Sequence, residues 1–401
     1  MTDIFTGSFT QQEPIPAEGI AAANAVMQSG RLHRYNTSGD QIAEAALLEE
    51  EFAATVGAKY CLAVASGGYA MTTALRASGV QHGDKILTNA FTLAPVPGAI
   101  AAVGGVPVFV GVTEELLIDL DDLAAKLDQA KVLLLSHMRG HICDMDRLMA
   151  MCDAAGVTVI EDCAHTMGAA WNGVPSGRWG RFGCYSTQTY KHINSGEGGL
   201  LIGDGAEDMA RAIMLSGSYM LFEKHRAAPP VATFAQIKYE TPNISGRMDN
   251  LRAAILRPQL RNLAAQCEKW NARYRVLEDG LADTVGLCLI ARPDKEQFVA
   301  SSFQFLLLDW DAAAVGDVLA RCAARGVELK WFGGAEPKGF TSRYDSWRYA
   351  PSEPMPASDR VLAGVVDMRL PLTFSLDDCA LLARIIRAEV SAVYQGSAAA
   401  E

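Results

Sequence analysis

Short apolar runs alternate with helical patterns over residues 60–161 of the chain. The runs predict strands at 60–65, 85–88, 106–110, 132–136 and 157–161. Between them, apolar residues recur at helical spacing at 69–77, 93–103, 120–127 and 145–155. This alternation is typical of βαβ units. It predicts the α/β fold class, with a mostly parallel sheet covered by helices on both faces.

The pattern changes in the last third of the chain. A long helical pattern at 249–280 is interrupted near Pro258, and a strand at 303–308, a helix at 312–325 and a closing helix at 376–395 follow. These elements indicate a smaller α+β unit. We therefore expect two domains: an N-terminal arm with a large domain over 1–250, and a smaller C-terminal domain over 251–401.

Composition excludes several classes of function. The 401 residues carry a formal net charge of −11, which disfavours binding to nucleic acid. The nine cysteines contain no C-x-x-C pair, so we expect neither a zinc site nor a disulfide framework, and free thiols fit a reducing cytoplasm. The N-terminus does not resemble a secretory signal, and apolar runs are too short to span a membrane. We expect a cytoplasmic protein without metal, nucleic-acid or membrane partners.

Polar groups follow three of the predicted strands, at Ser66–Tyr69, at 136–141 and at 162–165. Parallel sheets bind ligands at the carboxyl ends of their strands, so these groups should face one crevice. The first group also begins a helix, where free backbone amides at Gly67, Gly68 and Tyr69 would suit a phosphate. A simple turn is the alternative.

Two further sites, at residues 162–165 and at Lys191, carry groups that could hold and react with a cofactor. Asp162 could hold a protonated ring nitrogen and His165 could bond to or stack on that ring, although a helix cap and a buried structural imidazole are the alternatives. Lys191 lies between a hydroxyl-rich segment and the glycine-rich residues 196–199, which suits a Schiff-base lysine of lowered pKa; the alternative is a surface lysine. A phosphate site, a carboxylate and this lysine are together the needs of pyridoxal phosphate.

The motifs that follow one another along the chain match a known family. They are Ser66-Gly67-Gly68, the segments 83–87 and 105–109, Glu161-Asp162-Cys163-Ala164-His165, Lys191 with Gly196-Glu197-Gly198-Gly199, and Gly246-Arg247-Met248 leading into 253–255. In this order the chain resembles the DegT/DnrJ/StrS-type aminotransferases. These are pyridoxal-phosphate enzymes best known for aminating keto-sugars bound to nucleotides.

The resemblance implies a fold, an assembly and a set of roles. The fold would be fold type I, the aspartate aminotransferase type, built as a homodimer whose subunits share their active sites. The residues that match the family's motifs are Lys191 as the catalytic lysine, Asp162 at the ring nitrogen, His165 near the phenolic oxygen, Ser186 at the phosphate, and Gly68 and Tyr69 as amide donors to that phosphate.

The chain departs from the family pattern at several positions. Position 68 is Gly where the family has Thr, so a hydroxyl near the phosphate is missing. Leu93 stands where an aromatic ring covers the cofactor, with Phe91 as a possible substitute. The partner subunit's phosphate would be reached by Ser245 or Asn243.

The family resemblance predicts the reaction, and several residues are candidates for choosing the acceptor. We expect transfer of an amino group from a donor, glutamate or glutamine, to a keto-sugar or related polar ketone. An extra Arg139 near the crevice could hold a substrate carboxylate or phosphate. Acceptor choice should depend on Arg34, His137, Arg139, Lys330, Trp331 and the aromatic segment 331–349. That segment reads equally well as a plain surface loop.

Rival readings are an aminotransferase or dehydratase acting on a cyclitol, keto acid or aromatic precursor, and a non-catalytic cofactor-binding regulator. Relatives that dehydrate deoxysugars usually have His in place of the lysine. The retained Lys191 therefore favours transamination, and the adjacent His192 leaves an ambiguity.

Overall fold

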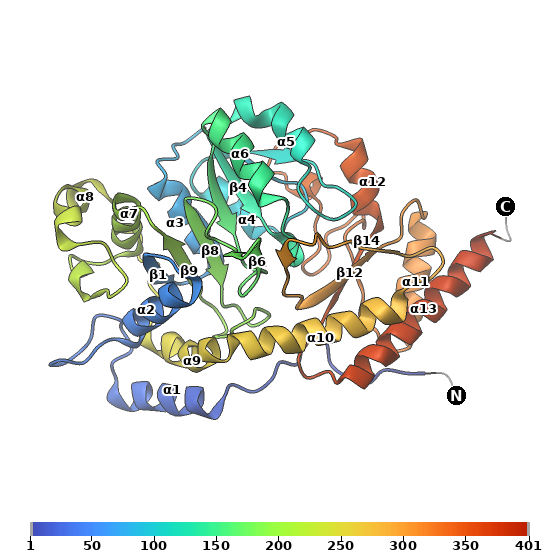
Figure 1. Ribbon diagram of the computed structural model, residues 1–401, viewed down its shortest axis with the longest axis horizontal. Helices are drawn as coiled ribbons and strands as arrows, with labels where there is room; N and C mark the ends of the chain where they lie inside the picture. Colours follow the sequence, from blue (N-terminus) through green and yellow to red (C-terminus); the bar gives the residue numbers. More distant parts are fainter. Residues whose placement is uncertain (1–2, 399–401) are drawn as a thin grey trace.

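A seven-stranded sheet forms the centre of the computed structural model, which describes residues 3–398 (Figure 1). Its strand order is β1-β9-β8-β5-β4-β2-β3. The strands are β1 (Tyr60–Val64), β2 (Lys85–Asn89), β3 (Val106–Val110), β4 (Val132–Ser136), β5 (Thr158–Asp162), β8 (Phe182–Ser186) and β9 (Gly199–Gly203). Neighbours from β3 to β8 pair in parallel, and β9 runs antiparallel to both of its neighbours. The sheet is therefore mostly parallel, and the expected α/β class is confirmed.

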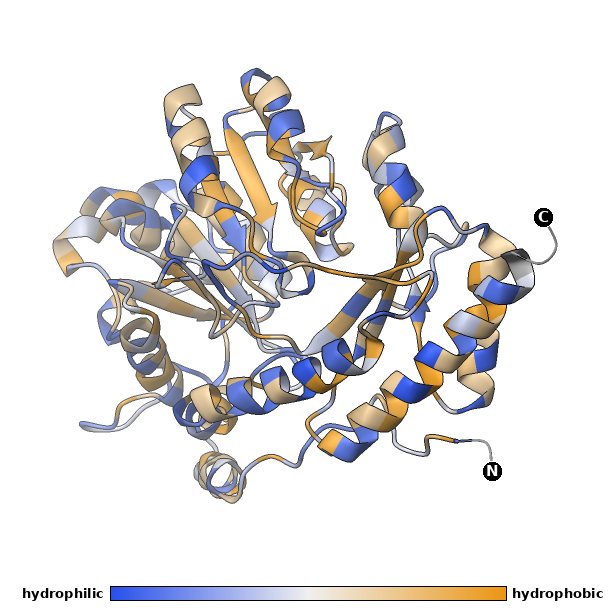
Figure 2. Cartoon of the chain, turned by 45° about the vertical axis from the view of Figure 1, so that its right-hand side comes forward, coloured by the Kyte–Doolittle hydropathy of each residue, from blue (hydrophilic) through white to orange (hydrophobic). Residues whose placement is uncertain are grey.

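Alternate residues of each strand enter two different hydrophobic cores. In β1, Leu62 joins the core under α3 (Gly67–Ala77), α4 (Pro95–Ala102) and α7 (Ala206–Ser216). Its neighbour Cys61 joins the core under α2 (Glu44–Val56), α6 (Met145–Ala155) and α9 (Asn250–Arg261). Side chains alternate across a strand, so an apolar run of five residues needs a helical layer on each face. Figure 2 shows these strands in hydrophobic colours, while the helices around them are mixed.

A second sheet lies beside the first and is wholly antiparallel. Its order is β10-β12-β14-β13, with β10 at Cys288–Leu289, β12 at Ser302–Leu306, β13 at Lys330–Trp331 and β14 at Val365–Arg369. The helices of this part are α10 (Leu263–Leu281), α11 (Ala312–Ala324), α12 (Pro356–Gly364) and α13 (Leu376–Ala398). In Figure 1, α10 extends from beneath the large sheet to the second one, where α13 packs along it.

The remaining elements are short or peripheral. They are the helices α1 (Ala17–Ser29), α5 (Leu120–Lys126) and α8 (Phe234–Glu240), and the three-stranded sheet of β6 (Ala170–Trp171), β7 (Val174–Pro175) and β11 (Glu296–Gln297). The pattern did not predict β8 and β9, whose buried runs are short and carry glycines. The long helical pattern breaks at Asn262 rather than at Pro258, which lies inside α9. None of the described helices is both long and apolar enough to cross a membrane.

The division at residue 250 agrees with the positions of the two main sheets but not with every packing contact. Near the N-terminus, the backbone amide of Phe5 donates to the carbonyl of Arg325 at 2.8 Å, and the rings of Phe5 and Phe9 pack against Phe374. The first residues of the arm thus contact the C-terminal part of the chain. The two-domain boundary stays a prediction.

Candidate active site

A cavity of about 610 Å³ lies at the carboxyl ends of the parallel strands, and residues of the second sheet close one side of it. Seven of the nine predicted cofactor residues line it: Gly67, Gly68, Leu93, Asp162, His165, Ser186 and Lys191. They come from five separate stretches of the chain between β1 and β9. The parallel topology brings their strand ends together, as the open α/β rule predicts. Tyr69 and Ser245 are not in the wall of this cavity.

The turn from β1 into α3 forms one end of the cavity. Ser66 caps the helix, because its Oγ accepts a hydrogen bond from the amide of Tyr69 at 3.0 Å. The amide expected at Tyr69 is therefore already bonded, and Gly67 and Gly68 supply the first amides of the helix. A Cβ built on Gly67 would lie 2.9 Å from Cβ of Ser186, whereas one on Gly68 would meet nothing closer than 3.9 Å. The turn therefore packs directly on the end of β8.

Asp162 ends β5 with its carboxylate buried in the cavity wall. Oδ2 accepts a hydrogen bond from Oγ of Ser136 at 3.0 Å, and Oδ1 accepts one from the amide of Ala164 at 3.1 Å. Burial raises the pKa of this carboxyl, although these donors and Lys191 oppose the effect. The hydrogen-bond donors that hold it are neutral, so a cation in the cavity would complement it. Ser136 was placed at the crevice from the sequence, but its bond to Asp162 was not predicted.

Lys191 and His165 meet in the middle of the cavity. Nζ of Lys191 lies 2.9 Å from Nε2 of His165. Burial, followed by repulsion from Arg139, lowers the pKa of Lys191 to about 7. Burial also lowers the pKa of His165 well below its ordinary value, so the imidazole is neutral at pH 7. The result is an amine that is partly unprotonated near neutral pH and has a neutral hydrogen-bonding partner.

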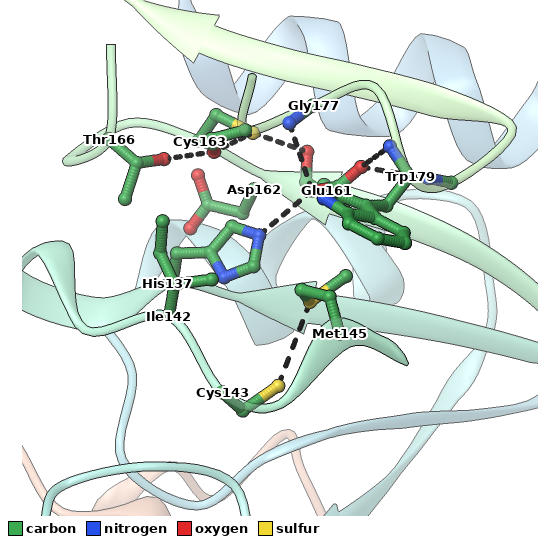
Figure 3. Close-up of polar contacts among 12 residues, drawn as sticks. His137, Ile142, Cys143, Met145, Glu161, Asp162, Cys163, Thr166, Gly177 and Trp179 are labelled. Atoms are coloured by element: carbon green, nitrogen blue, oxygen red, sulfur yellow. Dashed lines mark hydrogen bonds and ion pairs between the residues drawn. The ribbon is translucent and has the colours of Figure 1, made fainter. Parts of the chain in front are cut away.

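Behind Asp162, a second buried carboxylate supports the site (Figure 3). Glu161 accepts hydrogen bonds from the backbone amides of Gly177, Trp179 and Gly180 at 2.8–2.9 Å, and it bonds to Nε2 of His137 at 2.9 Å. Ligand atoms of His137, Glu161 and Cys163 lie within 4.8 Å of one another, a spacing that would suit a metal. Because the oxygens of Glu161 already accept these bonds, the cluster instead ties the loop at 177–180 to β5.

Three residues expected to shape acceptor choice are not in the cavity wall: His137, Arg34 and also Lys330, whose Nζ lies 3.8 Å from Asp367. His137 bonds to Glu161 and is not in the cavity wall. Arg34 is 1% exposed, and its guanidinium makes a double hydrogen bond to Glu49 at 2.7 and 2.8 Å. The side chains of His137 and Arg34 each bond to a buried glutamate within the fold. The local sequence could not reveal these contacts, because Glu49 and Glu161 lie far along the chain from Arg34 and His137 and meet them only in the folded protein.

Only some residues of the aromatic segment 331–349 line the cavity. Phe340 and Trp347 line the cavity, whereas Trp331 donates its Nε1 hydrogen to the carbonyl of Ala363 and lies outside it. Arg139 lines the cavity as predicted. Arg369, at the end of β14, also lines it and was missed, because nothing in its local sequence connects it to residues near Lys191.

The sequence left two pairs of alternatives open, one for the residue that covers the cofactor ring and one for the residue that reaches the partner subunit's phosphate. Leu93 lines the cavity, while Phe91 is buried with its ring 5.1 Å from that of Phe332. Asn243 and Ser245 lie together on an exposed loop, where the amide of Ser245 donates to Oδ1 of Asn243 at 3.0 Å. They do not contribute to the cavity of their own subunit.

The doubly wound sheet and this cavity define a pyridoxal-phosphate protein of fold type I. Residues 14–386 match the model of the DegT/DnrJ/EryC1/StrS aminotransferase family, and the chain belongs to that family. Membership confirms the resemblance seen in the sequence. It also confirms the expected cofactor, because the family depends on pyridoxal phosphate.

Individual relatives are similar at a moderate level. A putative L-glutamine:3-amino-2,3-dideoxy-scyllo-inosose aminotransferase of Micromonospora echinospora is 30% identical over 70% of this chain, and the matched region is 66% of that relative's length. The crystal structure of 3-amino-5-hydroxybenzoic acid synthase has a TM-score of 0.82 and 24% identity, with 96% of this chain and 99% of that chain covered. The GDP-4-keto-6-deoxy-D-mannose-3-dehydratase of E. coli has a TM-score of 0.81 and 18% identity, with 96% and 100% covered. At these identities, the two solved structures show the shared fold.

Proposed function

We propose that the protein is an aminotransferase that moves an amino group from an amino-acid donor to the ketone of a keto-sugar, cyclitol or related polar compound. The observation that carries the proposal is the contact of Lys191 Nζ with His165 Nε2 at 2.9 Å, in one cavity with Asp162. Transamination needs an amine that can accept and return a proton near neutral pH. The lowered pKa of Lys191, about 7, suits that task.

The residues of the cavity fit the family's cofactor. The amides of Gly67 and Gly68 with the hydroxyl of Ser186 would hold its phosphate, and Asp162 would hold its ring nitrogen. Asp162 is buried with neutral hydrogen-bond donors, which is the setting that a protonated ring nitrogen would complete. When bound, pyridoxal phosphate supplies an electron sink for the bonds at the reacting carbon. His165 would lie beside the ring, and Leu93 would cover it in place of an aromatic side chain.

The chain's own groups would move the proton in both half-reactions. In the first half-reaction, Nζ of Lys191 would take the proton from the donor's α-carbon as a general base and pass it on as a general acid. In the second half-reaction, it would act in the reverse direction and deliver a proton to the former ketone carbon. His165 holds the lysine in place through the 2.9 Å contact. The hydroxyl of Ser136 fixes the orientation of the Asp162 carboxylate through the bond at 3.0 Å. Each group acts from a position that the sheet edge determines.

The donor we propose is glutamine or glutamate. Support comes from the name of the Micromonospora relative, which uses L-glutamine and an amino-dideoxy inosose. That relative also favours a polyhydroxylated ring ketone as the second substrate. The family model and the cavity residues agree with this class of reaction without distinguishing one ring compound from another.

Dehydration is the second candidate, because the E. coli dehydratase shares the fold. In this chain Lys191 is retained and directed into the cavity beside His165. The neighbouring His192 is buried, with its ring 5.1 Å from that of Trp270. It lines an adjoining, smaller cavity and is not in the wall of the cavity that holds Asp162. His192 is therefore not the residue that faces Asp162, which favours transamination.

We also propose that the protein works as a homodimer in the cytoplasm. The exposed loop of Asn243 and Ser245 would then reach the partner subunit's phosphate, as the family resemblance implies. All nine cysteines are free thiols, which supports a reducing compartment. The test is the mass in solution: a monomer with full activity would contradict the shared site.

Spectroscopy of the purified, cofactor-loaded protein tests the reaction. We expect a visible absorbance band from lysine-bound cofactor, lost on addition of glutamine or glutamate and restored by a suitable ketone. Lys191→Ala should abolish the band and the activity, whereas Lys85→Ala, a substitution of an exposed lysine, should preserve both. A dehydratase would keep consuming substrate without an amino acid. A cofactor-binding regulator would bind the cofactor and show no change with either donor.

A further inference from the structure

Three cations from distant parts of the chain lie near one another, and two of them, Arg139 and Arg369, are in the cavity wall. Arg139 follows β4, Lys330 belongs to β13, and Arg369 ends β14. A single buried carboxylate, Asp367, lies among them, 2.9 Å from Nη2 of Arg139 and 3.8 Å from Nζ of Lys330. Its other oxygen accepts a hydrogen bond from Nε2 of Gln304 at 2.7 Å. The cluster therefore holds one negative charge against three positive ones.

The excess charge is not compensated by other groups of the described chain. Arg139 is 7% exposed, yet its Nε makes no hydrogen bond with the described residues, and neither does Nζ of Lys330. The carboxylates of the cavity wall, Asp162 and Glu197, form no ion pair with the three cations within residues 3–398. Arg369 forms no ion pair within residues 3–398, and Arg139 shares Asp367 with Lys330, so this side of the cavity carries positive charge that a bound anion would compensate.

The backbone at Arg139 supports the same conclusion. Its φ is 57°, in the left-handed region that a residue with a Cβ seldom adopts. Such strained backbone conformations are concentrated at functional sites. Gly140 continues the turn with a φ of 84°. The strained turn directs the guanidinium towards Asp367 and the cavity instead of towards solvent.

The cluster lies close to the reacting lysine and apart from the proposed phosphate site. The guanidinium carbon of Arg369 is 3.6 Å from the ring centroid of Tyr190, the residue before Lys191. Arg139, Arg369 and Lys330 all lower the pKa of Lys191, after burial as the largest cause. The amides of Gly67 and Gly68 belong to another segment, at the start of α3. An anion bound to the cluster would therefore belong to the substrate, near its reacting carbon.

We propose that both substrates, donor and ketone, carry an acidic group a few bonds from the reacting carbon and bind it in turn through Arg139 and Arg369, with the charge of Lys330 beside them. The proposal rests on the proposed function. A two-step aminotransferase uses one cavity for both substrates, so cations that hold the donor's carboxylate are still present when the ketone binds. A neutral ketone would leave Arg369 without an anionic partner among the described residues, and Arg139 and Lys330 with Asp367 alone. Guanidinium groups bind carboxylate and phosphate alike, so the shared chemistry is an acid group next to a ring or chain ketone.

Binding of unreactive acids tests the anion site without relying on catalysis. Calorimetry of the cofactor-loaded protein should show cyclohexanecarboxylate binding at least about tenfold tighter than cyclohexanecarboxamide. Arg369→Gln and Arg139→Lys should remove most of this preference. Arg369 forms no ion pair with Asp367 among the described side chains, so its replacement does not leave that carboxylate unpaired. Arg321→Gln, which alters an exposed ion pair with Asp317, is the matched control and should keep the preference.

Reaction of the aminated protein tests the second substrate. Its return to the visible band should be at least about tenfold faster with 3-oxocyclohexanecarboxylate than with 3-oxocyclohexanecarboxamide, or with dihydroxyacetone phosphate than with dihydroxyacetone. The two pairs distinguish a carboxylate from a phosphate. Equal rates within both pairs would overturn the proposal, because the cations would then serve the donor alone. Equal binding of cyclohexanecarboxylate and cyclohexanecarboxamide would overturn it as well. If acids bind as expected but no donor changes the spectrum, the anion site stands and the proposed transamination fails.

Discussion

Nζ of Lys191 lies 2.9 Å from Nε2 of His165, and the imidazole belongs to the segment that also carries Asp162. One short stretch after β5 thus supplies both the partner of the lysine and the carboxylate for a ring nitrogen. The charged groups around the amine are Arg139, Lys330 and Arg369 and the carboxylate of Asp162. With burial as the main cause, the excess of positive charge around Nζ lowers the pKa of Lys191.

This arrangement predicts the pH dependence of cofactor binding. The lysine reacts as the free amine, and burial with repulsion from Arg139 lowers its pKa to about 7. The rate at which the cofactor-free protein gains the visible band should therefore rise through about pH 7 and level off above about pH 8. A lysine with the ordinary pKa of about 10.4 would keep gaining rate at higher pH. In Arg139→Gln the midpoint should move upward; a downward or absent shift would contradict the electrostatic account.

Asp162 should be essential for rate but not for attachment of the cofactor. Asp162→Asn keeps the size of the side chain and removes the charge that would stabilise a protonated ring nitrogen. We expect turnover to fall by about 10²–10⁴-fold, with the lysine-bound band still present. Ser136→Ala removes one neutral donor from Asp162 and should cost less than about tenfold. Comparable losses in the two variants would mean that the carboxylate acts only through local packing.

Two adjacent glycines should respond differently to the same substitution. Gly67→Ala places a methyl group 2.9 Å from Cβ of Ser186 and should push α3 away from β8, so cofactor affinity falls. Gly68→Ala has its nearest neighbour at 3.9 Å and keeps the backbone amide, so affinity should stay near that of the wild type. Titration of the cofactor-free protein with pyridoxal phosphate measures both. Equal losses of cofactor affinity in the two variants would show that the flexibility of the glycine backbone matters more at this turn than the position of its amides.

The buried network around Glu49 should dominate the acid sensitivity of the large domain. Burial would raise the pKa of Glu49, but Arg34 and His225 outweigh it and lower the pKa to about 2. A carboxyl whose pKa is lowered on folding stabilises the protein above its ordinary pKa. We therefore expect this stability to be lost as pH falls from about 5 towards 2.

Glu49→Gln tests the same network at constant pH. It leaves Arg34 buried without a negative partner and should lower the free energy of unfolding by about 3–5 kcal/mol at pH 7. The adjacent Glu50, in an exposed pair with Arg226, offers a matched control. Denaturant titrations of Glu49→Gln and Glu50→Gln should show a large loss for the first only, since exposed pairs contribute little.

Much of the fold followed from local pattern. The strands at 106–110 and 132–136 were predicted with the bounds that the structure shows, because a buried parallel strand is a continuous apolar run between turn residues. β8 and β9 were missed, since glycines shorten their runs. The break at Asn262 was misplaced to Pro258, because a proline removes one backbone donor from a helix without always ending it. The helix ends at its C-cap residue Asn262, whose Nδ2 donates to the carbonyl of Pro258 at 3.2 Å.

The sequence by itself determined the fold class and the order of phosphate turn, carboxylate and lysine. The turn and the carboxylate each follow a predicted strand, and strand ends meet at one edge of a parallel sheet, whereas Lys191 was recognised from the motif around it. Only the tertiary structure decided which charged groups share the cavity. It paired Arg34 with Glu49 and His137 with Glu161, away from that cavity, and brought Arg369 from β14 to the residue beside Lys191. Burial and ion pairing depend on partners far along the chain, which local periodicity does not encode.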